Sequence, residues 1–184
     1  MSVSSKLRPK GNVSRLRPTP AIASHPKLGV ASIAMTGAYQ LEFFVEDDGT
    51  KPVLAWIKND LTPAQRRAIG TAMRRMLQVN GVRVCSSPWG EQLGDGLFEF
   101  RVRRTGTQMI NEGWPKPGSI DASERILLRV FCHAYGNRLI LLMGGYDKGS
   151  TPAKSRQRIE ITVARTRLRR HQARRAAGHR ARKR

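Results

Sequence analysis

The feature that most constrains this sequence is a pair of apolar segments in its C-terminal half. Residues 126–132 are apolar except for Arg129, residues 138–143 form a second run of strand length, and Ala134–Tyr135–Gly136–Asn137 supplies turn residues between them. Two such runs, joined by a short connection that contains Gly and Asn, predict a β-hairpin. The rest of the chain has to fold around this hairpin.

A polar loop and a strongly basic segment follow the hairpin. Gly144–Gly145 is expected to end the second strand, residues 146–152 are expected to form a loop, and Pro152 is well placed in the first turn of a helix. The side chains expected to face the sheet from this helix are Ile159, Val163 and Thr166–Leu168. A buried hairpin that leads into a basic loop and a basic helix points to a small α+β domain that handles a polyanion.

Charge is distributed unevenly along the 184 residues, whose formal net charge is +21. Residues 1–34 hold 6 Lys and Arg and no acid, residues 35–147 hold 14 against 12 acids, and residues 148–184 hold 14 against Glu160 alone. Cationic arms attract a polyanion and give salt-sensitive, mostly sequence-blind binding. Nucleic acid is the expected partner. A membrane surface is disfavoured because few large apolar residues follow Leu168, and tails that only solubilise are the plain alternative.

Several classes of protein are disfavoured by the remaining composition. Cys132 lies in a predicted core strand far from Cys85, so we expect a buried free thiol and no disulfide. The four histidines are scattered, so we predict no metal and no other cofactor. No apolar run approaches the ~20 residues of a membrane span, and the N-terminal segment lacks the apolar region of a secretory signal. A cytoplasmic protein is expected.

Three regions are predicted along the chain. Residues 1–34 are rich in Ser, Pro, Lys and Arg, and we expect a disordered basic extension, or an over-long start that precedes a natural start at Met35. Residues 35–170 are expected to form the folded domain. Residues 171–184 are expected to be a basic, disordered tail that frays beyond about Gln172.

The N-terminal half of the domain is predicted to hold one strand and two helices. Residues 39–45 are aromatic and apolar, which favours a strand at or near a sheet edge. Pro52 is expected to open a short helix that ends at Asn59–Asp60. Thr62 is a good N-cap for a longer helix that runs to about Val79. Its arginines, Arg66, Arg67, Arg74 and Arg75, are predicted to lie on solvated faces.

The next strand is marked by clean alternation over residues 97–103. Phe98, Phe100 and Val102 share one face, and Leu97, Glu99, Arg101 and Arg103 share the other, which predicts a half-buried strand with an open, charged surface. Residues 81–96 are expected to be a connection and residues 104–123 a long loop, with Trp114 as its anchor or as a base-stacking side chain. The predicted class is α+β, with a small antiparallel or mixed sheet, two N-terminal helices packed on one face and a basic C-terminal helix.

Four motifs in this order resemble a known family. They are the strand Gly96-Leu97-Phe98-Glu99-Phe100-Arg101-Val102, the strand Leu128-Arg129-Val130-Phe131, the run Leu141-Leu142-Met143-Gly144-Gly145-Tyr146-Asp147-Lys148, and the basic helix that follows Thr151-Pro152. Together they resemble the RelE/HigB toxin superfamily, and most closely its phage-derived HigB-like branch. The resemblance covers roughly residues 39–170.

The resemblance implies a toxin of a type II toxin–antitoxin system that acts as a ribosome-dependent messenger-RNA endonuclease and inhibits translation and growth. In such enzymes basic side chains on the sheet hold mRNA in the ribosomal A site, and the 2′-OH attacks the adjacent phosphate without a metal. A helix-turn-helix antitoxin is the implied partner. The implied catalytic residues are Arg101, Arg129, Tyr146 and Lys148, and the implied RNA-binding residues are Arg103, Arg104, Lys154, Arg156 and Arg158.

The residue types suit this chemistry. Arg and Lys stabilise the charge that builds up on a pentacoordinate phosphate, and neighbouring cations are expected to lower the pKa of Tyr146 so that it can act as a base. The structural alternatives are that Arg129 is an outward strand residue, that Tyr146 caps the loop, and that Arg101 pairs with Glu99 or with an acid across the sheet. Two other functions stay open: a ParE-like, non-enzymatic inhibitor of DNA gyrase, and a catalytically silent nucleic-acid-binding protein.

Overall fold

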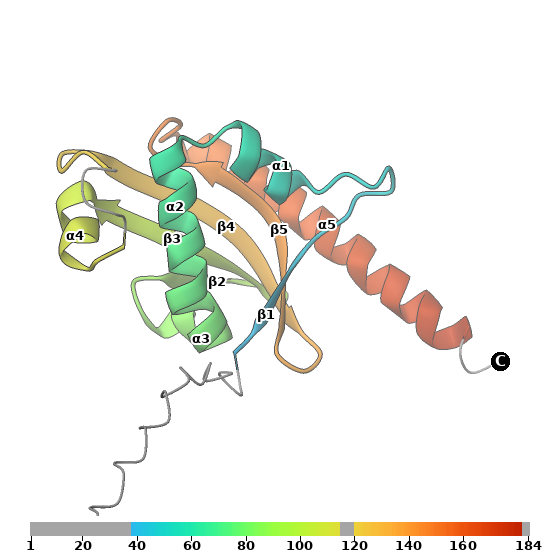
Figure 1. The fold of residues 1–184 in the computed structure, drawn as a ribbon. Helices are drawn as coiled ribbons and strands as arrows, with labels where there is room; N and C mark the ends of the chain where they lie inside the picture. The colour runs from blue at the N-terminus through green and yellow to red at the C-terminus, as the bar shows by residue number, and fades with distance from the viewer. Residues whose placement is uncertain (1–37, 115–119, 182–184) are drawn as a thin grey trace, which may run out of the picture. The chain divides into compact units, whose positions relative to one another are not determined.

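The computed structural model describes residues 38–114 and 120–181 (Figure 1). The predicted N-terminal extension, residues 1–34, and the last three residues of the predicted C-terminal tail lie outside the described residues. The described chain combines a β-sheet with several helices, and it confirms the predicted α+β class.

A five-stranded mixed sheet forms the centre of the domain. Its strands are β1 (Gln40–Phe43), β2 (Gly90–Gly94), β3 (Leu97–Thr105), β4 (Arg125–Tyr135) and β5 (Leu139–Asp147). The order across the sheet is β1-β5-β4-β3-β2, in which β1 runs parallel to β5 and every other pair is antiparallel. The predicted edge position of the first strand and the predicted hairpin, β4–β5, are both confirmed.

Strand β5 is longer than the sequence predicts, because Gly144–Gly145 does not end it. Gly145 pairs with Val130 in the middle of the sheet, and a Cβ on Gly145 would come within 2.5 Å of the Trp56 ring. The glycine therefore allows a close approach of the first helix and does not mark a turn. Phe131 pairs with Gly144 while Cys132 pairs with Leu142, so the register shifts at this point, as in a β-bulge.

Strand β2 lies inside the predicted connection 81–96, where no strand is expected from the sequence. It pairs with β3 through a tight turn in which Gly94, Asp95 and Gly96 all have positive φ, of 83°, 54° and 76°. Asp-Gly is the dipeptide that such hairpin turns favour. The segment before β2 is a 3₁₀ helix, η2 (Gly81–Ser86).

Two helices precede η2, as predicted. The first is α1 (Pro52–Asn59), and the second is α2 (Pro63–Ala72), which continues through a π-helical turn, η1 (Met73–Leu77), into α3 (Gln78–Asn80). The predicted cap of α2 is present: Thr62 Oγ1 accepts the Gln65 N–H at 3.2 Å, and the Gln65 side chain accepts the Thr62 N–H at 3.0 Å. Gly81, with φ of 57°, ends the helix.

The predicted long loop 104–123 holds a short helix, α4 (Gly106–Asn111), where no helix is expected from the sequence. Thr105 and Gln108 cap it by the same reciprocal pair of hydrogen bonds as α2. Trp114, just beyond it, stacks on Trp89 with ring centroids 5.6 Å apart, in agreement with the anchoring role. The Thr-x-x-Gln signal of this cap is present in the sequence.

Helices cover both faces of the sheet (Figure 1). On one face Phe98 and Phe100, each almost fully buried, pack against α1 and α2. On the other face Phe131 and its neighbours pack beneath the C-terminal helix α5 (Lys154–Ala181). Each fully buried Phe contributes roughly 2 kcal/mol relative to an exposed one, so both layers stabilise the sheet.

The contacts of α5 correct two predictions. Ala164 and Leu168 are buried against the sheet, whereas Ile159 is 57% exposed and Val163 36% exposed, so the predicted face is wrong for these two. The helix also continues past Gln172 to Ala181, where fraying is expected from the sequence. Ala and Arg are strong helix formers. Among the described residues no helix is long and apolar enough to cross a membrane.

Candidate functional site

Glu99 occupies the centre of a cluster of charged side chains between the sheet and the first turns of α5. Its carboxylate accepts hydrogen bonds from Arg101 Nε at 2.6 Å and from Gln157 Nε2 of α5 at 3.1 Å, and it lies 3.5 Å from Arg129 Nε. Glu99 has no exposed surface. The predicted open, charged face of this strand is therefore covered at Glu99, because α5 crosses it.

The register of the sheet places three of the four predicted catalytic residues side by side. Arg101 of β3 is the partner of Arg129 on β4, and Arg129 is in turn the partner of Tyr146 on β5. Lys148 follows at the end of β5, where its N–H donates to the Leu127 carbonyl at 2.8 Å and extends the ladder by one step. Residues far apart in the sequence thus meet in one row across three strands.

This row is half buried and half open. Arg129 is 5% exposed and Tyr146 4% exposed, so α5 shields both from solvent. The Arg101 side chain is 24% exposed and contacts Glu91 of β2, whose side chain is 50% exposed. We call Glu91, Glu99, Arg101, Arg129 and Tyr146 the charge cluster. Its open edge lies along β2 and β3, and its buried edge lies under α5.

Burial dominates the electrostatics of the charge cluster. Burial raises the pKa of Glu99, and the positive charges of Arg129 and Lys148 oppose the rise only in part. Burial likewise lowers the pKa of Arg129, although Glu99 opposes this, and it lowers the pKa of Arg101. A guanidinium stays protonated throughout the physiological range. Glu99 is therefore the internal counter-ion of two arginines.

The pKa of the Tyr146 phenol is not lowered, although the sequence predicts that neighbouring cations lower it. Burial raises the pKa of its phenol, as do the nearby carboxylates of Glu99 and Glu160, and these effects outweigh the opposing effect of Arg129. The expected lowering of this pKa is thus wrong. The buried hydroxyl has no hydrogen-bond partner among the described residues. A neutral phenol of this kind can donate a proton or a hydrogen bond, but it is a poor base at neutral pH.

The five predicted RNA-binding residues fall into two groups. Arg103 is exposed on the same face as Arg101, and Lys154, Arg156 and Arg158 are exposed on the first turns of α5, where Arg156 pairs with Glu160 at 2.5 Å. Arg104 points to the opposite face of the sheet, over the Trp89 ring at 4.0 Å and beside Glu112 at 3.2 Å. Four of the five thus lie on the α5 side of the sheet, and Arg104 does not.

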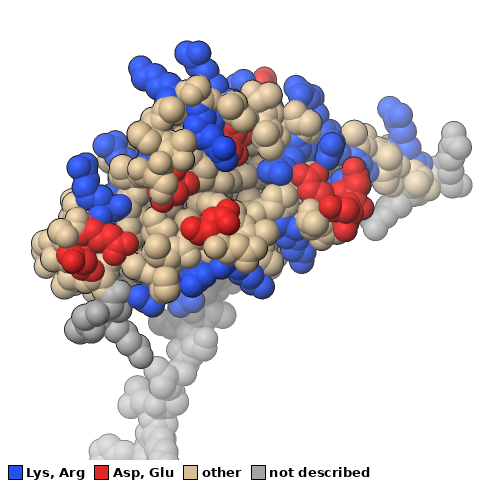
Figure 2. Space-filling view, turned by 90° about the horizontal axis from the view of Figure 1, so that it is seen from above, with Lys and Arg blue, Asp and Glu red and all other residues tan. Residues whose placement is uncertain are grey.

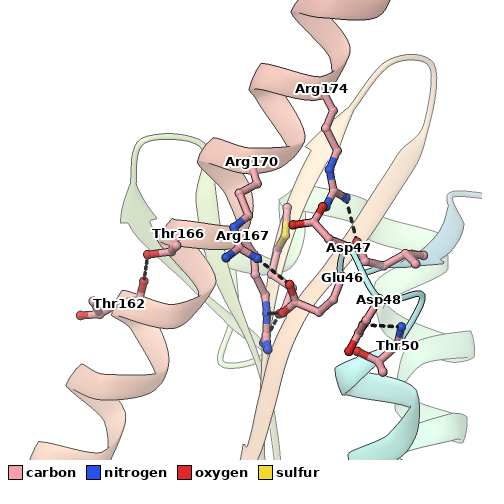
Figure 3. A network of polar contacts seen from close by, with 11 residues as sticks. Glu46, Asp47, Asp48, Thr50, Thr162, Thr166, Arg167, Arg170 and Arg174 are labelled. Atoms are coloured by element: carbon pink, nitrogen blue, oxygen red, sulfur yellow. Dashed lines mark hydrogen bonds and ion pairs between the residues drawn. The ribbon is translucent and has the colours of Figure 1, made fainter.

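An acidic turn between β1 and α1 holds the middle of α5 (Figure 3). The Glu46 carboxylate accepts from Arg167 Nε and from Arg170 Nη1, each at 2.7 Å, and Asp47 pairs with Arg174. Arg167 also donates to the Met143 carbonyl at 2.8 Å. The sequence pattern of residues 46–49, three acids followed by Gly, predicts only a turn that ends the first strand. Three arginines of the basic helix therefore bind acids of this turn.

The surface seen from above Figure 1 nonetheless carries many Lys and Arg side chains. Figure 2 shows Lys and Arg side chains around most of the outline, with Asp and Glu in a few separate groups. Within the described residues no group of three or more His, Cys, Asp or Glu side chains is arranged to hold a metal ion. The fold and this site define a basic α+β domain with a mixed sheet and a half-buried row of two arginines and a tyrosine.

Comparisons of the chain with family models, with curated proteins and with solved structures gave no match.

Proposed function

We propose that the protein is a toxin of a type II toxin–antitoxin system that cleaves messenger RNA, as the resemblance to the RelE/HigB superfamily implies. The observation that carries this proposal is the row formed by Arg101, Arg129 and Tyr146 on adjacent strands, with Lys148 at its end. A preorganised set of cations beside a hydrogen-bond donor is the arrangement that stabilises a charged phosphoryl transition state.

The chemistry assigned to each residue follows from its environment. The 2′-OH of one nucleotide attacks the adjacent phosphate, and Arg101, Arg129 and Lys148 stabilise the negative charge that develops on the phosphorus oxygens. The neutral phenol of Tyr146 protonates the departing 5′-oxygen. Glu91 is the exposed carboxylate of the charge cluster, and it accepts the proton of the attacking hydroxyl. The products are a 2′,3′-cyclic phosphate and a free 5′-hydroxyl.

Access to Arg129 and Tyr146 requires the first turns of α5 to move aside, because Gln157 of this helix binds Glu99 directly. In this proposal the mRNA is presented in the ribosomal A site in the cytoplasm, and a helix-turn-helix antitoxin neutralises the toxin. Arg103, Lys154, Arg156 and Arg158 then contact the RNA backbone beside the charge cluster.

A second candidate is a nucleic-acid-binding protein without catalytic activity. It is favoured by Glu99, whose buried carboxylate already occupies the space between Arg101 and Arg129 where a phosphate would have to bind. In that case the charge cluster only stabilises the fold, and the exposed cations bind nucleic acid through its backbone.

The test is inducible expression in a bacterial host, with growth and the 5′ ends of cellular mRNA followed together. Wild type is expected to arrest growth and to generate new mRNA ends with a 5′-hydroxyl. Arg101→Ala/Arg129→Ala is expected to abolish both, and Lys148→Ala, which changes a side chain outside the core, to reduce cleavage by about 10²-fold or more. Arg138→Ala, at the exposed turn between β4 and β5, is the matched control.

Three results decide between the candidates. New mRNA ends that disappear in Lys148→Ala while the variant stays folded support the endonuclease. Growth arrest without RNA cleavage contradicts it and points to another target such as DNA gyrase. RNA binding without arrest or cleavage, unchanged by the Lys148 substitution, supports the second candidate.

A further inference from the structure

A groove on the face of the sheet opposite α5 is lined almost entirely by cations and one aromatic ring. Its lining residues are Arg66, Arg67, Gly70, Thr71, Arg74, Arg75 and Trp114. All four arginines are exposed, and none of the described residues that line the groove is acidic. We call this surface the α2 groove. From the sequence alone, the same four arginines are expected only to be solvated.

Helical spacing arranges these residues in two parallel rows. Arg66, Gly70 and Arg74 form one row at intervals of four, and Arg67, Thr71 and Arg75 form the other. A pair of arginines thus stands at each end of the groove, about 12 Å apart for eight residues of helix. Gly70 has no side chain and has open space where a Cβ would stand, so no side chain fills the groove at Gly70, between the two pairs of arginines. The groove is long enough for more than one phosphate.

Three arginines of the groove have no carboxylate partner among the described residues, in contrast to the arginines of the charge cluster. Arg66 donates to the Lys58 carbonyl at 2.5 Å, and Arg75 donates to the carbonyls of Glu112 and Gly113 at 3.0 and 3.3 Å. A carbonyl fixes a guanidinium in place but leaves its full positive charge. Arg74 makes no polar contact with the described residues. The Glu112 carboxylate, which is close in sequence to Trp114, pairs with Arg104.

Trp114 gives the groove a stacking platform. Its half-buried ring stacks on Trp89, which stacks on Phe100 with centroids 6.1 Å apart, so the aromatic column runs from the core to the groove. The π-helical turn η1 begins at Met73 and includes Arg74 and Arg75. Such turns alter the direction of side chains within a helix and are frequent at functional sites.

We infer that the α2 groove binds a single-stranded nucleic acid, with phosphates between the two arginine pairs and a base stacked on Trp114. Fixed cations beside a partly exposed aromatic ring are a combination that binds single strands with little sequence preference. The surface lies on the other side of the sheet from the charge cluster, and the inference does not depend on catalysis there.

The test uses the full chain and a fluorescein-labelled ten-nucleotide oligouridylate, with an oligothymidylate of the same length as the DNA arm. Anisotropy measures affinity, and tryptophan quenching reports stacking. Arg66→Gln/Arg74→Gln is expected to weaken binding about tenfold or more and to reduce the salt dependence of log Kd by roughly 0.7 for each phosphate that is no longer bound. Trp114→Phe is expected to remove most of the quenching while affinity falls less.

The matched control is Lys51→Gln/Arg138→Gln, which removes two exposed charges away from the groove. Circular dichroism melts establish that each variant is folded. The inference is supported if the groove variant loses affinity and the control does not, for RNA, DNA or both. Equal losses in both variants would show diffuse charge and overturn it. Binding of poly-glutamate as tightly as RNA, with the same dependence on Arg66 and Arg74, would overturn it in favour of an acidic protein segment.

Discussion

Gly145 shows how one residue sets the distance between two layers of the molecule. A methyl group added at Gly145 would stand 2.5 and 2.8 Å from two carbons of the Trp56 ring of α1. Overpacking of this kind costs typically about 1–3 kcal/mol. We expect Gly145→Ala to lower the free energy of unfolding by about 2 kcal/mol in a urea titration.

The neighbouring glycine provides the control for this prediction. A Cβ on Gly144 would be 3.5 Å from Phe131 and 3.6 Å from Arg167, which is ordinary packing, so Gly144→Ala is expected to change the stability little. Gly145→Ala combined with Trp56→Leu should recover part of the stability, because it removes the clashing ring. An equal effect of the two alanine substitutions would contradict the close approach.

Tyr135 is expected to give the protein a pH dependence in the alkaline range. Burial and a hydrogen bond to the Glu42 carboxylate raise its pKa to about 12, from 10.0. The unfolded phenol ionises near pH 10 and the folded one only near 12, so the stabilisation is complete below pH 10 and is lost as the pH rises towards 12. Absorbance titration at alkaline pH should show a component near 12 that Tyr135→Phe removes and Glu42→Gln shifts down.

At the scale of elements, the acidic turn after β1 is expected to hold α5 on the sheet. Glu46 binds Arg167 and Arg170, and the side chains of Glu46 and Arg167 are only 20% and 17% exposed. Partly buried, doubly bound carboxylates are worth more than surface pairs. Glu46→Gln should therefore lower the free energy of unfolding by roughly 1–2 kcal/mol and speed amide exchange around Leu168.

Asp47 is the matched residue for this experiment. It pairs with Arg174, but its side chain is 76% exposed, so the same change of charge in Asp47→Asn should cost less than about 1 kcal/mol. Faster exchange in Asp47→Asn than in Glu46→Gln would show that the end of the helix, and not its middle, is the point of attachment.

Elements with a strong local signal are predictable from the sequence, and those that depend on distant contacts are not. The start of α2 depends only on local contacts, because the side chains of Thr62 and Gln65 bond to each other's backbone N–H and Pro63 occupies the first helical position. The prediction of this helix start is confirmed. The face of α5 is mispredicted because Ile159 and Val163 are more apolar than Ala164, yet the small Ala164 is the residue that fits against the sheet. Strand β2 escapes prediction although Asp95–Gly96 marks its turn.

The candidate site follows the same division. Strand alternation is enough to place Arg101 and Glu99 on one face, but the row from Arg101 to Tyr146 depends on the register of three strands. The cover over Glu99 depends on Gln157, which is 58 residues away in the sequence. Burial then reverses the pKa shift expected for Tyr146. No local pattern carries that information.

At the scale of the whole molecule, cations occur on both sides of one sheet in two different electrostatic states. On the α5 side Arg101 and Arg129 are both paired with Glu99 and Arg129 is buried, whereas on the α2 side the four arginines of the groove are exposed. Charge that is paired inside the protein adds little to its long-range field, and charge that is left exposed attracts a partner. We therefore expect nucleic-acid binding to weaken at salt concentrations far below those that affect the folding of the domain.

The reactivity of the two cysteine thiols can report how fast this sheet opens. Cys132 has no exposed surface in the middle of β4, and burial raises its pKa well above that of an ordinary thiol, whereas Cys85 is half-buried. A thiol reagent should label Cys85 in the native protein and reach Cys132 only when β3, β4 and β5 separate. The rate at which Cys132 is labelled under native conditions then gives the rate of global unfolding. In the Cys85→Ser variant this slow labelling is the only phase.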